Sequence, residues 1–181
     1  ELAKRKIESV KNEFIEYISD EIKSSEDVEK LKAVYQNVFA LFEVCGFPFD
    51  EMITGFFKAR ASEFTEAAPN SDLLIKTLDG IVSINAEISD RNTARNAIRR
   101  HMSKKSDING IYEMYLKLKE KKYIEPQELN ICLTESVEEN ILNETGKFAD
   151  SKEKLQALVR MYEEFQTAVS SRDYTPVKEV D

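Results

Sequence analysis

The segment EDVEKLKAVYQNVFALFEVCGFP, residues 26–48, contains the start, the apolar face and the end of one helix. Its apolar side chains recur three or four residues apart, which is the spacing of a single helix face. They are Val28, Leu31, Val34 or Tyr35, Val38, and Leu41 or Phe42. Ser24 and Ser25 stand before the segment as N-cap residues, and Gly46 is typical of the position just past a helix end. The segment therefore predicts a helix over about 26–45.

The same spacing recurs along most of the chain. It predicts further helices at about 2–23, 50–66, 108–122, 126–146 and 151–170. The stretch 72–104 forms either one long helix or two helices joined near Ser89-Asp90. No segment alternates as a strand does, and five Gly and four Pro are few for a protein with many tight turns. We therefore expect an all-α bundle of seven or eight amphipathic helices without a sheet.

A chain of 181 residues suits one large domain or two small ones. We expect residues 1–170 to form a single helical domain, with 1–68 and 69–170 as the alternative sub-units. Residues 171–181 are expected to form a flexible C-terminal tail.

The formal net charge of -8 argues against overall attraction to nucleic acid or anionic membranes. No apolar run approaches the roughly 18 residues that a membrane-spanning helix needs. Cys45 and Cys132 both lie in apolar helical surroundings, so we interpret them as buried free thiols. This interpretation favours a reducing intracellular compartment.

The segment RNTARNAIRRHMSKK, residues 91–105, concentrates positive charge in this acidic chain. On a helix, Arg91, Arg95 and Arg99 are four residues apart and share one face. Arg100, Lys104 and Lys105 widen that face. Like charges at this spacing repel by a few tenths of a kcal/mol, so we expect a negative group opposite them.

Three kinds of negative group fit the basic face of residues 91–105. The chain's own acids are one, and the first helix offers Glu13, Glu16, Asp20 and Glu21. An acidic protein partner is the second. Phosphate or nucleic acid is the third, but a nucleic-acid surface would interleave aromatic rings, and the segment has none except the imidazole of His101.

Most catalytic and metal-binding patterns are absent from the sequence. His101 is the only histidine and lies among Arg and Lys, so no His/Cys metal set can be assembled. The chain contains neither a Walker-type nor a dinucleotide-binding glycine pattern. Carboxylates with Mg²⁺ are the remaining route to an enzyme.

Residues 46–64, GFPFDEMITGFFKARASEF, resemble the closing segment of the all-α, MazG-like NTP pyrophosphohydrolases. The residues that fit that segment are Gly46, Phe49, Asp50, Lys58 and Ser62. Glu13 and Glu16 match two of the three acids in the family's opening helix. The resemblance covers residues ~10–64 and implies a helical bundle; if the family's nucleotide hydrolysis were kept, Glu13 and Glu16, with Glu29 as a third ligand, would hold its Mg²⁺.

The acidic metal site of that family is incomplete in this chain. The family's second helix carries Glu-x-x-Asp, whereas this chain has Lys32 where the Asp belongs and Glu29 one position away. The Asn that the family carries late in the motif is also missing near Arg60. The resemblance thus implies a bundle that kept the fold and lost the chemistry.

From these patterns we predict a non-catalytic binding or assembly module without a cofactor. It would act through protein–protein contacts, either by self-association or with a protein partner. The basic face formed by Arg91, Arg95, Arg99, Arg100, Lys104 and Lys105 would orient the contact. The alternatives are a Mg²⁺-dependent nucleotide pyrophosphohydrolase and a phosphate or nucleic-acid binder.

Overall fold

The computed structural model describes residues 2–46, 49 and 51–170. The chain divides into two compact units, residues 1–97 and residues 98–181. This division differs from the sub-units 1–68 and 69–170 considered from the sequence, because residues 71–88 pack with the first three helices in unit 1. The predicted tail at 171–181 lies outside the described residues.

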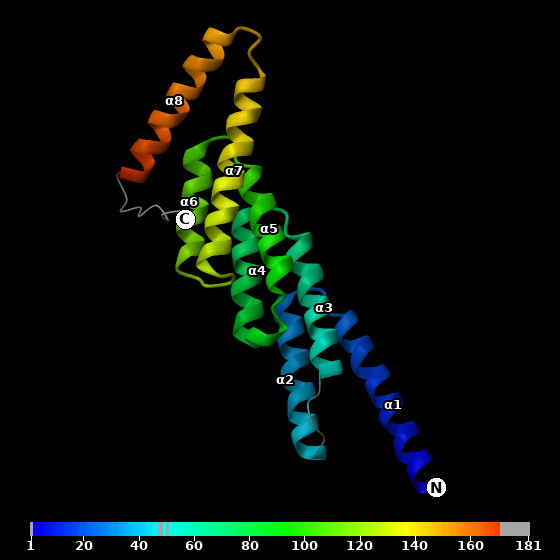
Figure 1. Ribbon diagram of the computed structural model, residues 1–181. Helices are drawn as coiled ribbons and strands as arrows, with labels where there is room; N and C mark the ends of the chain where they lie inside the picture. The colour runs from blue at the N-terminus through cyan, green and yellow to red at the C-terminus, as the bar shows by residue number, and fades with distance from the viewer. Residues whose placement is uncertain (1, 47–48, 50, 171–181) are drawn as a thin grey trace, which may run out of the picture. The chain divides into compact units, whose positions relative to one another are not determined.

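The described residues form eight α-helices and one short 3-10 helix, with no strand among them. Figure 1 shows their order along the chain. The helices are α1 Leu2–Lys23, α2 Val28–Cys45, α3 Glu51–Ala67, α4 Ser71–Ile84, η1 Ala86–Ile88, α5 Arg91–Ser103, α6 Ile108–Lys119, α7 Pro126–Gly146 and α8 Ser151–Ser170. The all-α prediction is confirmed, and the stretch 72–104 proves to be two helices.

Side chains at the helix starts satisfy backbone N–H groups that have no partner inside the helix. Asp27 accepts a hydrogen bond from the backbone N of Lys30 at 2.8 Å. Asn70 and Asp107 make the same contact at the starts of α4 and α6. The prediction of a serine cap for α2 was wrong, because Asp27 occupies the N-cap position.

The end of α2 follows the prediction. Gly46 has φ 66°, in the left-handed region that a residue with a β-carbon seldom adopts. Its N–H donates to the carbonyl oxygens of Phe42 and Glu43, which leaves fewer of the last carbonyls without a partner.

Unit 1 buries its apolar side chains among α1, α2, α3, α4 and η1. Aromatic rings lie at its centre: the centroids of Tyr35 and Phe57 are 5.0 Å apart, and those of Tyr35 and Phe49 are 5.4 Å apart. Such pairs contribute about 0.5–1.5 kcal/mol each beyond the area they bury. Arg60 on α3 adds a polar link, since its Nε donates to the carbonyl oxygen of Ser25 at 3.1 Å and so holds the turn after α1.

Unit 2 contains α6, α7 and α8, which all pack on one another. Tyr112 and Tyr115 of α6 are buried and their rings stack with centroids 5.8 Å apart. The Tyr115 hydroxyl donates to Oδ1 of Asn130 on α7 at 2.8 Å. Among the described side chains of α8, Ala157 and Met161 are buried against this unit.

The two cysteines differ in exposure. Cys132 is buried on α7, as predicted, but Cys45 at the end of α2 is exposed, so the prediction of two buried thiols was wrong for Cys45. Within the part of the chain that the structure describes, no helix combines the length and the hydropathy that crossing a bilayer would require.

Two helical glycines offer a test of the packing in unit 1. A β-carbon at Gly80 of α4 would lie 2.6 Å from Cγ1 of Val28 on α2, whereas a β-carbon at Gly55 of α3 would meet nothing within 4 Å. We expect Gly80→Ala to lower the free energy of unfolding by about 1 kcal/mol, because overpacking outweighs the gain in helix propensity. We expect Gly55→Ala to raise it by about 0.5–1 kcal/mol. Urea unfolding followed by circular dichroism measures both, and a stabilised Gly80→Ala variant would contradict the close approach of α2 and α4.

Candidate functional sites

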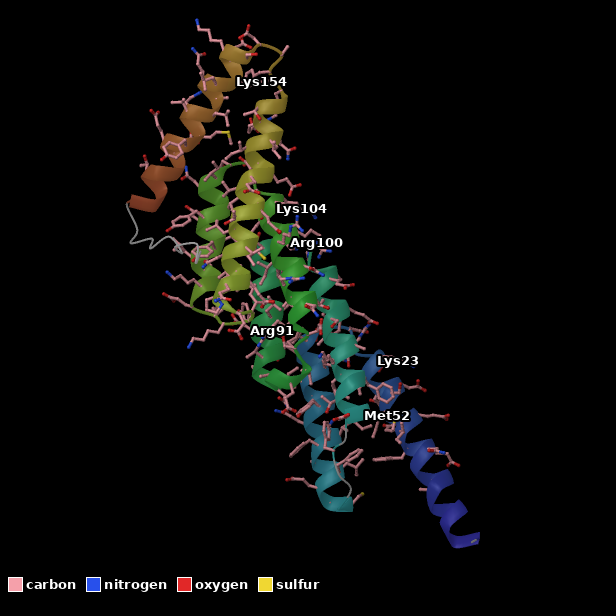
Figure 2. All side chains as sticks on the ribbon, in the orientation of Figure 1. Lys23, Met52, Arg91, Arg100, Lys104 and Lys154 are labelled. Carbon is pink, nitrogen blue, oxygen red and sulfur yellow. The ribbon has the colours of Figure 1, made fainter. Side chains whose placement is uncertain are left out.

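The basic face of α5 arises from a strict division of that helix into two sides. Ala94, Ala97, Ile98, His101 and Met102 are buried and recur three or four residues apart. Arg91, Arg95, Arg99 and Arg100 are exposed on the other side of the helix. Lys104 is exposed just past the end of α5, and Lys105 is half-buried. Figure 2 labels Arg91, Arg100 and Lys104 along this segment.

Arg99 of the basic face contacts an acid of this chain. Nε of Arg99 lies 2.9 Å from Oε2 of Glu135 on α7, and both side chains are substantially exposed. An exposed pair of this kind contributes roughly 0–1 kcal/mol, because water and salt screen it. Glu135 was not among the acids considered from the sequence, since helix spacing gives no relation between positions on α5 and α7.

The carboxylates suggested by the pyrophosphohydrolase resemblance are placed on two helices. Glu13 and Glu16 are exposed on α1, and Glu29 is exposed on α2. Among the described residues, no three His, Cys, Asp or Glu side chains come together as a metal ion would need. Asp50, which also belongs to the resemblance, lies outside the described residues. The Mg²⁺ site therefore stays a prediction from the resemblance alone.

Lys58, another residue of the resemblance, pairs with the residue that starts α5. Its Nζ lies 3.4 Å from Oδ1 of Asp90. Asp90 also accepts hydrogen bonds from the backbone N and from Oγ1 of Thr93, both at 2.8 Å. These hydrogen bonds, with the ammonium of Lys58, outweigh burial and hold the pKa of Asp90 below its ordinary value.

α8 carries an uncovered apolar stripe that we call the outer face of α8. It consists of Leu155, Leu158, Val159 and Tyr162, which are 40% to 63% exposed. Their spacing of three and four residues places them on one side of the helix. Ala157 and Met161 lie on a different side and are buried. α8 therefore has an apolar side that is exposed in addition to the apolar side that packs within unit 2.

A pocket of about 280 Å³ lies in unit 2 between the start of α6, the later half of α7 and α8. We call it the Asn140 pocket. Its lining is Ser106, Asp107, Ile108, Asn140, Glu144, Phe148, Ala157, Arg160, Met161 and Glu164. Asn140 is only 8% exposed, and its Oδ1 has no hydrogen-bond partner within the part of the chain that the structure describes. One feature of the sequence could have indicated this pocket. Asn140 is a polar residue at a core position of α7, three residues after the buried Val137.

Comparison with known proteins gives no relative: no protein-family model, no curated protein and no solved structure matches this chain.

Asp90, which caps the start of α5, yields a prediction about how the free energy of unfolding depends on pH. Because the pKa of Asp90 is lowered in the folded chain, its contribution to stability is fully present above about pH 4 and is lost as the pH falls through the folded pKa. We expect Asp90→Asn to keep the cap but lose the charge, and to cost about 0.5–1 kcal/mol at pH 7. The difference from the parent chain should vanish at low pH.

Urea unfolding of the parent and of Asp90→Asn across pH 2–7 measures this difference. Lys58→Met is the companion variant, because it removes the ion pair but leaves both hydrogen bonds from Thr93. It should produce a smaller change than Asp90→Asn at pH 7. A difference that grows as the pH falls would refute the assigned role of Asp90.

Proposed function

We propose that this chain is a helical binding and assembly module that pairs with a second copy of itself through the outer face of α8. The observation that carries the proposal is the apolar stripe of Leu155, Leu158, Val159 and Tyr162, whose side chains are 40% to 63% exposed among the described residues. Exposed apolar side chains gathered on one face favour association, because pairing removes them from water. A second copy offers the same stripe and so a self-complementary surface.

The charges beside the stripe favour an antiparallel arrangement of the two copies. Lys152 and Glu163 are eleven residues apart on α8, which returns to nearly the same side of a helix after three turns. Both therefore flank the stripe on one side. In an antiparallel pair related by a twofold axis, Lys152 of one copy faces Glu163 of the other. A parallel pair would instead place like charges at the same height.

The basic face of α5 gives this proposal a second element. The side of α5 that carries Arg91, Arg95, Arg99 and Arg100 is exposed in a chain whose net charge is -8, so its positive charge can orient acidic surface on an approaching copy. Such charges act mainly on the rate and the orientation of encounter, whereas the apolar stripe supplies the contact that persists.

Sedimentation equilibrium of the full chain at several concentrations tests the proposal. We expect a monomer–dimer equilibrium, and we expect Leu158→Glu to weaken it by about tenfold or more, since it buries a charge where a leucine would be. Leu41→Glu is the matched control, because Leu41 of α2 is also a leucine and, like Leu158, is 40% exposed, but it lies outside the outer face of α8. A dimer that tolerates Leu158→Glu, or a chain that is monomeric at all concentrations, would refute the proposal.

A charge exchange tests the antiparallel register separately. Lys152→Glu and Glu163→Lys should each weaken the dimer, because each brings like charges together across the pair. The double variant with both changes should recover most of the parent affinity. Additive weakening in the double variant would rule out this register.

The two alternative functions have a direct test of their own. A ligand that binds only the folded chain raises its stability, by about 2.7 kcal/mol at one hundred times its dissociation constant. We expect no rise in melting temperature with (d)NTPs, with or without Mg²⁺, or with short DNA and RNA. A nucleotide shift that requires Mg²⁺ and disappears in Glu13→Gln with Glu16→Gln would replace our proposal with pyrophosphohydrolase activity. A shift with nucleic acid alone would point to the basic face.

A further inference from the structure

We propose that the Asn140 pocket binds a primary ammonium group carried on a short aliphatic chain. The pocket lies within unit 2 and involves the side of α8 that carries Ala157 and Met161, which we call its inner side. This inference therefore does not rest on pairing through the outer face. It starts from an acceptor atom that the protein itself leaves without a donor. Oδ1 of Asn140 is buried and has no hydrogen-bond partner among the described residues. A buried acceptor without a donor is unfavourable, and a ligand donor would remove that penalty.

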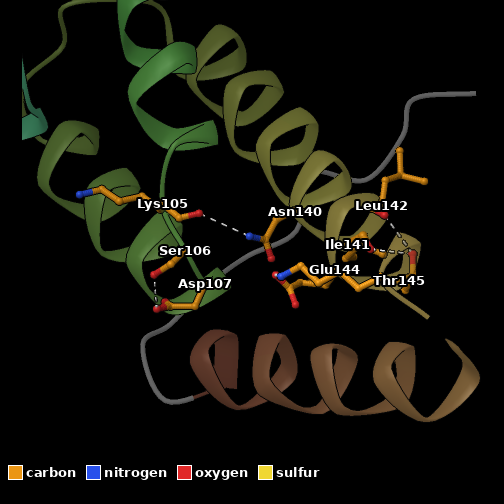
Figure 3. Close-up of polar contacts among 9 residues, drawn as sticks. Lys105, Ser106, Asp107, Asn140, Ile141, Leu142, Glu144 and Thr145 are labelled. Atoms are coloured by element: carbon orange, nitrogen blue, oxygen red, sulfur yellow. Dashed lines mark hydrogen bonds and ion pairs between the residues drawn. The ribbon is translucent and has the colours of Figure 1, made fainter. Parts of the chain in front are cut away.

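The orientation of the Asn140 amide follows from its other contact. Its Nδ2 donates to the carbonyl oxygen of Lys105 at 3.4 Å, as Figure 3 shows. A carbonyl oxygen can only accept, so the NH₂ group must face Lys105 and the oxygen must face the other way. In Figure 3 that oxygen lies on the side of Glu144 and α8. The group that completes the site must therefore be a donor.

The charges around Asn140 select a cationic donor. Asp107, Glu144 and Glu164 line the pocket, and Arg160 is the one basic residue in the lining. Lys147 pairs with Glu144 from outside the lining, and the acids still outnumber the bases when it is counted. The ammonium of Lys105 points away from Asn140 in Figure 3. A carboxylate or phosphate ligand would meet acids and an acceptor, whereas an ammonium group would meet complementary charge.

Two of these carboxylates already have partners that fix their positions. Asp107 accepts from the backbone N of Gly110 at 2.7 Å and from Oγ of Ser106 at 3.2 Å. Glu144 is held by Lys147, which directly follows the end of α7. A carboxylate has about four acceptor positions, so each can receive a further N–H. An ammonium group offers three N–H donors, which suits one amide oxygen and neighbouring carboxylates.

The rest of the lining and the volume define what carries the ammonium group. Ile108, Phe148, Ala157 and Met161 give the pocket an apolar wall. At about 280 Å³ the pocket is at the lower limit of small-molecule sites, which run from about 300 to 1,000 Å³. A chain of four or five methylene groups fits these limits. A free alkylamine and the side chain of a lysine in another protein share this chemistry.

Calorimetric titration of the full chain with pentylamine at neutral pH tests the proposal. We expect a dissociation constant of about 1 mM or tighter, which is within reach of a ligand with so few atoms. Pentan-1-ol and pentanoate have the same chain without the cation and should not bind. Chemical shifts of the Asn140 side-chain NH₂ should move during the pentylamine titration. Two further ligands distinguish a lysine side chain from a free alkylamine. A site for lysine side chains tolerates a bulky backbone end and should bind Nα-acetyl-lysine amide, whereas a site for free alkylamines should bind only 1,5-diaminopentane.

Variants locate the binding. Asn140→Leu removes the acceptor and should weaken pentylamine binding by about tenfold or more, without lowering the melting temperature of the unliganded chain by more than the loss of one weak hydrogen bond. Glu164→Gln should weaken it by roughly twofold to fivefold. Glu139→Gln makes the same change on an exposed acid of α7 outside the pocket and should leave binding unchanged.

Three results would overturn the proposal. They are no heat and no shift of the Asn140 amide with pentylamine, equal binding of pentan-1-ol, and pentylamine binding that Glu164→Gln and Asn140→Leu leave unchanged. If Asn140→Leu fails to fold, Glu164→Gln against Glu139→Gln decides the question alone.

Discussion

Burial of one apolar side of each helix is the constraint on which the rest of this structure depends. α5 buries Ala94, Ala97, Ile98 and Met102 on one side. Its arginines lie on the opposite side and are exposed for that reason. α8 departs from this pattern. Among its described side chains, Ala157 and Met161 are buried, and a second apolar side is exposed. α8 thus has apolar surface left to bury in another contact.

The spacing of apolar residues predicted the helices well because that spacing is a local property. The interruption at residues 85–90 shows the limit of this signal, since the sequence left one helix or two as equal alternatives. Asn85 and Asp90 settle it by accepting hydrogen bonds from Glu87 and Thr93, so each stabilises a new helix start. The prediction that Cys45 is buried was wrong for a different reason. Periodicity identifies the face of α2 on which it lies but not how far along that face the neighbouring helices extend.

The candidate sites were less predictable than the fold because each joins positions far apart in the chain. The exposed side of α5 follows from spacing, yet its partner Glu135 lies on α7, beyond any helical relation. The Asn140 pocket requires the cap of α6, the later half of α7 and the inner side of α8 together. A polar residue at a core position was visible in the sequence. The absence of a donor for its oxygen becomes evident only when all three elements are in place.

The two sides of α8 link the proposed assembly to the Asn140 pocket. A ligand in the pocket would contact the inner side, and a second copy would cover the outer side. Since either event would favour the position of α8 packed on α6 and α7, each would reduce the cost of the other. Linkage requires the effect to be reciprocal, so an amine that tightens the dimer must itself bind the dimer more tightly. The inner and outer sides of α8 would then act as one coupled element, although they share no residue.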